Sequence, residues 1–79
     1  MALPILSKMF VSGVATGIGE ADLRRHFQQF GKMADVHMPI DRLTGRHRGF
    51  AFVHFTRLEH LICVLAYRHT IDGHAVGTR

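Results

Sequence analysis

The sequence predicts an α+β domain of ferredoxin-like topology, a β-α-β-β-α-β sandwich in which two helices cover one face of a four-stranded antiparallel sheet. Two observations predict this fold. Stretches with alternating apolar residues, typical of strands, are separated by two stretches whose apolar residues recur at helical spacing. The chain of 79 residues also has room for only one hydrophobic core. We therefore expect a single domain at 8–79, cut from a longer protein, after an N-terminal extension at 1–7.

A strand and a helix open the predicted domain. Residues 8–12 (KMFVS) alternate between two faces, as in a half-buried strand, and a glycine follows them. Residues 20–30 change to helical spacing. On this helix Leu23, Phe27 and Phe30 share one face, and we expect all three side chains in the core.

A second strand and a polar loop come next. Residues 33–38 predict a strand with Val36 and Met38 directed inward. Pro39 indicates that this strand lies at an edge of the sheet, because proline has no backbone N–H to donate to a neighbouring strand. Residues 41–48 (DRLTGRHR) are polar and predict a loop.

The second half of the chain repeats the pattern. Residues 48–55 predict the third strand and residues 57–68 the second helix. Residues 71–73 (IDG) predict a turn, and residues 74–79 begin the fourth strand. Four apolar residues of the second helix have core spacing: Leu58, Leu61, Val64 and Leu65. Cys63 lies in the same helix, and we expect its thiol to be packed.

The third strand carries large apolar side chains on both of its faces. With both helices on one side of the sheet, strand alternation places Val53 and Phe55 beneath them. The same alternation leaves Phe50 and Phe52 on the open face, beside Phe10 of the first strand. Exposed aromatic side chains gathered on neighbouring strands mark a binding surface.

Composition narrows the class of partner. Ten Lys and Arg against six Asp and Glu favour a polyanion. Cys63 is the only cysteine, so neither an internal disulfide nor a thiolate zinc cluster can form, and the spacing of the seven histidines predicts no metal site and no cofactor. The longest apolar run, 61–66, is too short to span a membrane, and the first residues lack the pattern of a signal peptide. We expect no membrane partner, and a location in the nucleus, the cytoplasm or both.

Two segments carry a resemblance to a known family. Residues 48–55 (RGFAFVHF) fit every fixed position of the octapeptide of the RNA recognition motif, K/R-G-F/Y-G/A-F-V-x-F/Y. Residues 9–14 (MFVSGV) resemble the hexapeptide that accompanies it. The KMFVSGV start is similar to the heterogeneous nuclear ribonucleoprotein A/B and Musashi group, and QQFG with DVHMP resembles the second recognition motif of the TAR DNA-binding protein. Ser12 departs from this group, which commonly has glycine there.

The resemblance implies a role for each residue of the open face. Phe10 and Phe52 would each stack a base, Phe50 would lie against the sugars between them, and Arg48 would pair with a phosphate. Two stacks supply about 2–6 kcal/mol, whereas micromolar affinity requires about 8 kcal/mol, so further contacts are needed. The candidates for them on and beside the open face are Lys8, Asp35, His37, His54 and Arg79. The candidates in the loop are Arg42, Arg46 and His47.

The function predicted from these residues is a non-catalytic module that binds single-stranded RNA, in a protein of mRNA processing or regulation. Single-stranded DNA is a second candidate ligand, and a neighbouring recognition motif or protein partner in the parent chain is a further one. The alternative is a domain of the same fold that binds a peptide or a subunit, for example through Ile62 with Leu58 or Tyr67. Such domains usually lack the stacking rings. An enzyme of similar topology, such as an acylphosphatase, needs a positioned amide, and the chain contains no asparagine.

Overall fold

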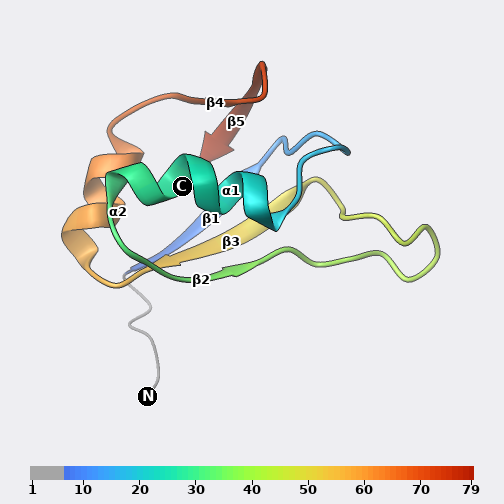
Figure 1. Cartoon of the computed structure of the whole chain (residues 1–79), viewed down its shortest axis with the longest axis horizontal. Helices are drawn as coiled ribbons and strands as arrows, with labels where there is room; N and C mark the ends of the chain where they lie inside the picture. Colours follow the sequence, from blue (N-terminus) through green and yellow to red (C-terminus); the bar gives the residue numbers. More distant parts are fainter. Residues whose placement is uncertain (1–6) are drawn as a thin grey trace.

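A computed structural model describes residues 7–79, and its two helices lie against one face of an antiparallel sheet (Figure 1). The elements in chain order are β1 (Lys8–Ser12), α1 (Glu20–Phe27), the 3₁₀ helix η2 (Gln28–Phe30), β2 (Met33–His37), β3 (Phe50–Phe55), α2 (Leu58–Leu65), β4 (His69–Ile71) and β5 (His74–Thr78). Of the expected extension at 1–7, only Ser7 lies within the described residues, and it is buried. No helix in this part of the chain has the length and apolar character needed to cross a bilayer.

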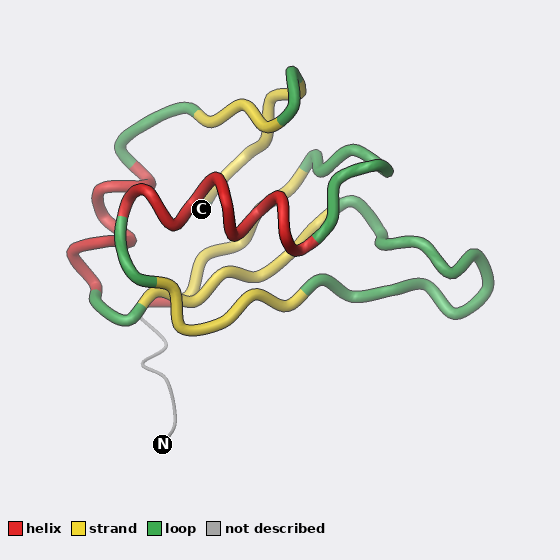
Figure 2. Tube along the Cα trace, in the orientation of Figure 1, coloured by secondary structure: helices red, strands yellow, loops and turns green. Residues whose placement is uncertain are grey.

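The sheet has five strands in the order β2-β3-β1-β5-β4, and every neighbouring pair is antiparallel. The α+β class and the two helices on one face agree with the prediction, but the number of strands does not. The additional strand is β4, which pairs with β5 across a tight turn at Asp72 and Gly73 (Figure 2). Both turn residues have positive φ, 51° and 82°, as a two-residue hairpin turn requires.

The edge position that Pro39 predicted for the second strand is confirmed. β2 ends at His37, two residues before Pro39, and it forms one edge of the sheet. Val36 and Met38 are both buried, as predicted.

The second helix is shorter than the sequence predicts. It covers Leu58–Leu65 rather than 57–68, and only Leu61 and Val64 are buried. The expectation for Leu58 and Leu65 is wrong: they are 44% and 42% exposed, because two turns of helix direct only a narrow stripe onto the sheet. The expectation of a packed thiol at Cys63 is also wrong, since that residue is exposed.

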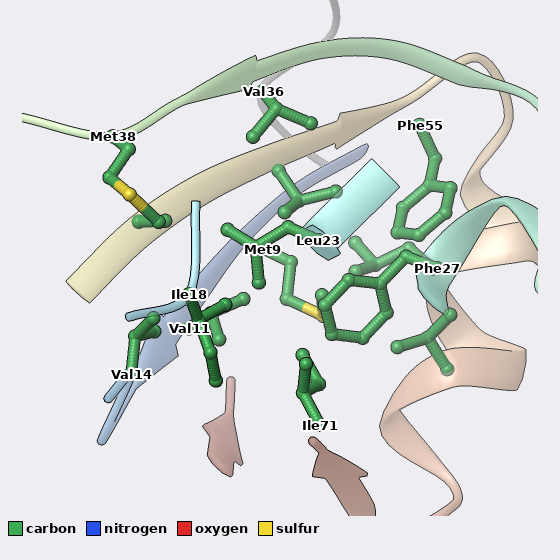
Figure 3. Packing of buried hydrophobic residues seen from close by; sticks show 14 residues of the cluster. Met9, Val11, Val14, Ile18, Leu23, Phe27, Val36, Met38, Phe55 and Ile71 are labelled. Atoms are coloured by element: carbon green, nitrogen blue, oxygen red, sulfur yellow. The ribbon is translucent and has the colours of Figure 1, made fainter. Parts of the chain in front are cut away.

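The core lies between α1, α2 and the covered face of the sheet. Figure 3 shows its side chains meeting there, among them Met9 of β1, Leu23 and Phe27 of α1, and Phe55 of β3, each with no exposed surface. Phe30 was expected in the core but is only partly buried, because it falls in η2, beyond the end of α1.

A pair of histidines packs beside this core. Nε2 of the buried His69 lies 2.7 Å from the carbonyl oxygen of Val64, so it donates to that oxygen. Nδ1 of His69 is then an acceptor, and Nε2 of His26 donates to it at 3.0 Å. Burial lowers the pKa of His26 below its usual 6.5, and the neighbouring His69 adds a smaller effect in the same direction.

We expect the folded domain to lose stability as the pH falls below about 6.5. The unfolded chain takes up a proton on His26 near that pH, whereas the folded chain takes it up only at lower pH, so acid favours the unfolded state. His26→Gln, which keeps a donor for His69, should flatten the change in the free energy of unfolding between about pH 5 and 7. Urea unfolding at several pH values measures this, with His74→Gln at an exposed site as the control. A His26→Gln profile as steep as the wild-type profile would contradict it.

Candidate nucleic-acid interface

Three phenylalanine rings meet on the face of the sheet that the helices leave open. The β1–β3 register sets Phe10 opposite Phe52 and Ser12 opposite Phe50. Residues opposite one another in an antiparallel pair share a face, so the rings come together. The ring centroids of Phe10 lie 5.5 Å from Phe52 and 5.7 Å from Phe50, and those of Phe50 and Phe52 lie 5.9 Å apart. We call these three residues the ring cluster.

The strand period explains why the ring cluster stays accessible. On β3, partly exposed and buried residues alternate from Phe50 to Phe55 without interruption. Ala51 and Val53 have no exposed surface, whereas Phe50 and Phe52 on the opposite face are only partly buried. The residues that hold the helices thus also fix the direction of the rings, because adjacent side chains of a strand point to opposite faces.

A row of side chains crosses β2, β3 and β1 at the level of the ring cluster and ends at Arg79, just after β5. His37 of β2 lies opposite Phe52, and Phe52 lies opposite Phe10. Phe10 and Arg79 exchange two backbone hydrogen bonds, of 2.7 and 3.0 Å, which places Arg79 at the far end of the row. A second row pairs His54 with Lys8.

Each ring of the cluster has one basic side chain over its face. Nζ of Lys8 lies 4.5 Å from the centroid of Phe52, a short cation–π distance. Cζ of Arg79 lies 5.7 Å from the centroid of Phe10. Cζ of Arg48 lies 5.9 Å from the centroid of Phe50. The sequence indicated that these cations border the open face, but not that each would cover a different ring.

The structure gives Asp35 a partner in the helix layer. The β2–β3 register shifts between Met33 and Asp35, which is a bulge in the edge strand. The carboxylate of Asp35 lies 4.0 Å from a guanidinium nitrogen of Arg24 on α1. The register still sets Asp35 opposite His54, so Asp35 keeps the open-face position that strand alternation predicts, at the edge of the sheet and within reach of Arg24.

The loop between β2 and β3 is tied to the rest of the domain by His47. Its Nδ1 accepts a hydrogen bond from the backbone N–H of Gly49 at 3.0 Å, and its Nε2 donates to the carbonyl oxygen of Ala15 at 2.9 Å. Both ring nitrogens are thus used within the domain, and His47 orients the loop rather than offering a free donor. This role could not be predicted from the sequence, because Ala15 is 32 residues away.

The two loop arginines stay at the surface. Arg42 and Arg46 are both exposed. Arg46 lines a hollow of about 480 Å³ between the loop and the start of α1, and none of the residues of the ring cluster lines it. The structure therefore places Arg46 beside the loop, apart from the rings.

Comparison with known proteins agrees with this geometry. Residues 9–76 match the model of the RNA recognition motif family. Over 72 residues the chain is 39% identical to heterogeneous nuclear ribonucleoprotein 1 of Arabidopsis thaliana, a match that covers 91% of this chain and 18% of the relative. Over 53 residues it is 47% identical to the mitochondrial glycine-rich RNA-binding protein 5 of the same plant, covering 67% of this chain and 18% of the relative. The chain thus spans about a fifth of the length of these relatives.

A solved structure shows the same fold. The RNA-binding domain of Hrp1, solved in complex with RNA, superposes with a TM-score of 0.86 at 32% identity, over 92% of this chain and 44% of that one. The family's octapeptide covers Arg48, Gly49 and the whole of β3, and its hexapeptide falls on β1 and the residues that follow, so the two motifs together contain the ring cluster. The match over residues 9–76, together with these motifs, shows that the chain belongs to the RNA recognition motif family.

Proposed function

We propose that this domain is a non-catalytic module that binds single-stranded RNA, within a protein of mRNA processing or regulation. The observation that carries the proposal is the ring cluster: three phenylalanines in mutual contact on an open sheet face, each accompanied by a basic side chain. Two relatives support it by name, as a heterogeneous nuclear ribonucleoprotein and an RNA-binding protein. The Hrp1 domain supports it through its complex with RNA.

Stacking and charge would act together at this surface. Every base has a π-face, so an aromatic ring binds any base, and each stack contributes about 1–3 kcal/mol. Phe10 and Phe52 would each take a base, Phe50 would contact the sugars, and Arg48 would meet a phosphate. In a duplex, neighbouring base pairs cover these faces, so single strands are the expected ligand.

Side chains in the two rows would supply the remaining contacts. His37 and Arg79 flank the stacking rings in one row, and His54 lies beside Lys8 in the other. Their donors and acceptors would meet the edges of the stacked bases, where sequence is read. Asp35 and Arg46 are weaker candidates, since one pairs with α1 and the other lies beside the loop.

The alternative partner, a peptide or another subunit, would bind at α2 rather than at the open face of the sheet. α2 exposes Ile62 (59%), and Tyr67 just beyond it is 60% exposed, so a peptide or subunit has an apolar surface to bind. We rank this second because it gives no role to the ring cluster or to its three cations. The nucleus, the cytoplasm or both stay our predicted location. The names of the relatives point to different compartments, one nuclear and one mitochondrial.

The domain should bind short single-stranded RNA of random sequence and bind the same RNA annealed as a duplex much more weakly. Affinity should fall with salt, and if Lys8, Arg48 and Arg79 each neutralise one phosphate, log K should change with log[salt] with a slope of about −2. Fluorescence polarisation at several salt concentrations measures both quantities. Equal affinity for the single strand and the duplex, or no binding at low salt, would overturn the proposal.

A further inference from the structure

We propose that the three basic side chains of the open face exchange between two partners, the rings of the free domain and the phosphates of a bound strand. In the free domain Lys8, Arg48 and Arg79 occupy the faces of the ring cluster, and they leave these faces for backbone phosphates when bases stack. This inference rests on the proposed function, and it adds how the same side chains serve two states of one site.

The one-to-one arrangement of cations and rings carries the inference. Lys8 lies over Phe52 and Arg79 over Phe10, so the two rings expected to stack bases are each covered by a different side chain. The covers come from separate places along the open face: Lys8 begins β1, whereas Arg79 follows β5. None of the salt bridges found among the described residues involves either side chain, so the ring is the partner that the structure shows for each cation.

A base and a cation compete for the same place. A cation–π contact needs the charge over the ring face within about 6 Å of the centroid, and a stacked base needs that face for its own ring. An exposed cation–π contact is weaker than a base stack, so the base displaces the cation. The displaced cation then needs a new partner, and the ligand's phosphates provide one within reach of a flexible side chain.

Cations that leave the rings and cations that stay in place can be distinguished by one measurement. If each cation instead stayed in place and stacked on the outer side of the base, removing it would weaken binding to every ligand that carries bases. If the cation must leave, its removal uncovers the ring, and a ligand without phosphates should bind more tightly. The sign of the effect with an uncharged backbone therefore distinguishes the two arrangements.

The test compares a single-stranded RNA with a peptide nucleic acid of the same base sequence, whose backbone carries no charge. Lys8→Ala removes both the charge and the side chain that lies over Phe52; it should weaken RNA binding, reduce the magnitude of the salt slope by about 0.7, and tighten binding of the peptide nucleic acid by about 2- to 5-fold. Arg79→Ala should do the same through Phe10. Ring signals of the phenylalanines, followed by NMR, detect even weak binding of the uncharged ligand.

Arg25→Ala is the matched control, because Arg25 lies on α1 and its side chain is 76% exposed. It should leave the affinity for both ligands at the wild-type value, and thermal unfolding checks that every variant is folded. The exchange is wrong if Lys8→Ala and Arg79→Ala leave the affinity for the peptide nucleic acid unchanged or lower it, or if that ligand does not bind the protein. A wild-type domain that fails to bind RNA at all would instead overturn the proposed function, so the two failures are separable.

Discussion

Replacing both Phe10 and Phe52 with alanine should lower the affinity for single-stranded RNA by about 30- to 20,000-fold, the equivalent of two lost base stacks. The reason is geometric. The two rings face one another across β1 and β3 with centroids 5.5 Å apart, on the open face of the sheet. Their removal also takes the cations of Lys8 and Arg79 off their rings, which leaves charge attraction as the main remaining source of affinity.

The measurement is a polarisation titration of the double variant and of each single variant. The single changes need not sum to the double change, because residues in contact usually couple. Tyr67→Ala is the matched control: it removes an exposed aromatic ring next to α2, at a distance in the fold from the open face, and should keep wild-type affinity. A double variant that binds within about threefold of the wild type would show that stacking does not hold the RNA.

Much of this site could be predicted from the sequence because the side chains of a strand alternate with a period of two residues. Once residues 50–55 are read as a strand, the burial of Val53 and Phe55 determines that Phe50 and Phe52 lie on the opposite face. Pairing with β1 then brings Phe10 beside them. The octapeptide independently indicated the same division, and the structure places all three rings together.

The errors have a common physical cause, which is that short elements and side-chain partners depend on distant residues. β4 has three residues, and only its pairing with β5 makes it a strand. Leu58 and Leu65 fit a helical stripe, but they are the first and last residues of α2 and lie partly in solvent. Asp35 keeps its place opposite His54, but its ion pair with Arg24 depends on how α1 packs beside β2, which strand alternation does not predict.

Substitution on the face beneath the helices should lower the stability of the domain rather than its affinity for RNA. Phe55→Ala should lower the free energy of unfolding by about 3–5 kcal/mol, the usual loss for a large aromatic side chain removed from a core. Phe55 has no exposed surface and packs in the cluster with Phe27 and Leu61. Small domains have a total stability of about 5–15 kcal/mol, so a loss of this size removes a large part of it. Urea unfolding followed by far-UV circular dichroism gives the value directly.

Phe52→Ala makes the decisive comparison, because the same residue type is lost from the same strand three positions earlier. Phe52 is only partly buried, and its neighbours on the open face are two rings and a cation, so no closed cavity forms. The loss of stability should be about 1–3 kcal/mol, the value of two aromatic pairs, and smaller than the loss at Phe55. Its RNA affinity should nonetheless fall by about 5- to 150-fold. Phe55→Ala, measured where it is still folded, should bind RNA almost normally. If the two variants instead lost stability and affinity in the same proportion, the two faces of β3 would not have separate functions. The assignment of one face to the core and the other to RNA, inferred from strand alternation, would then be wrong.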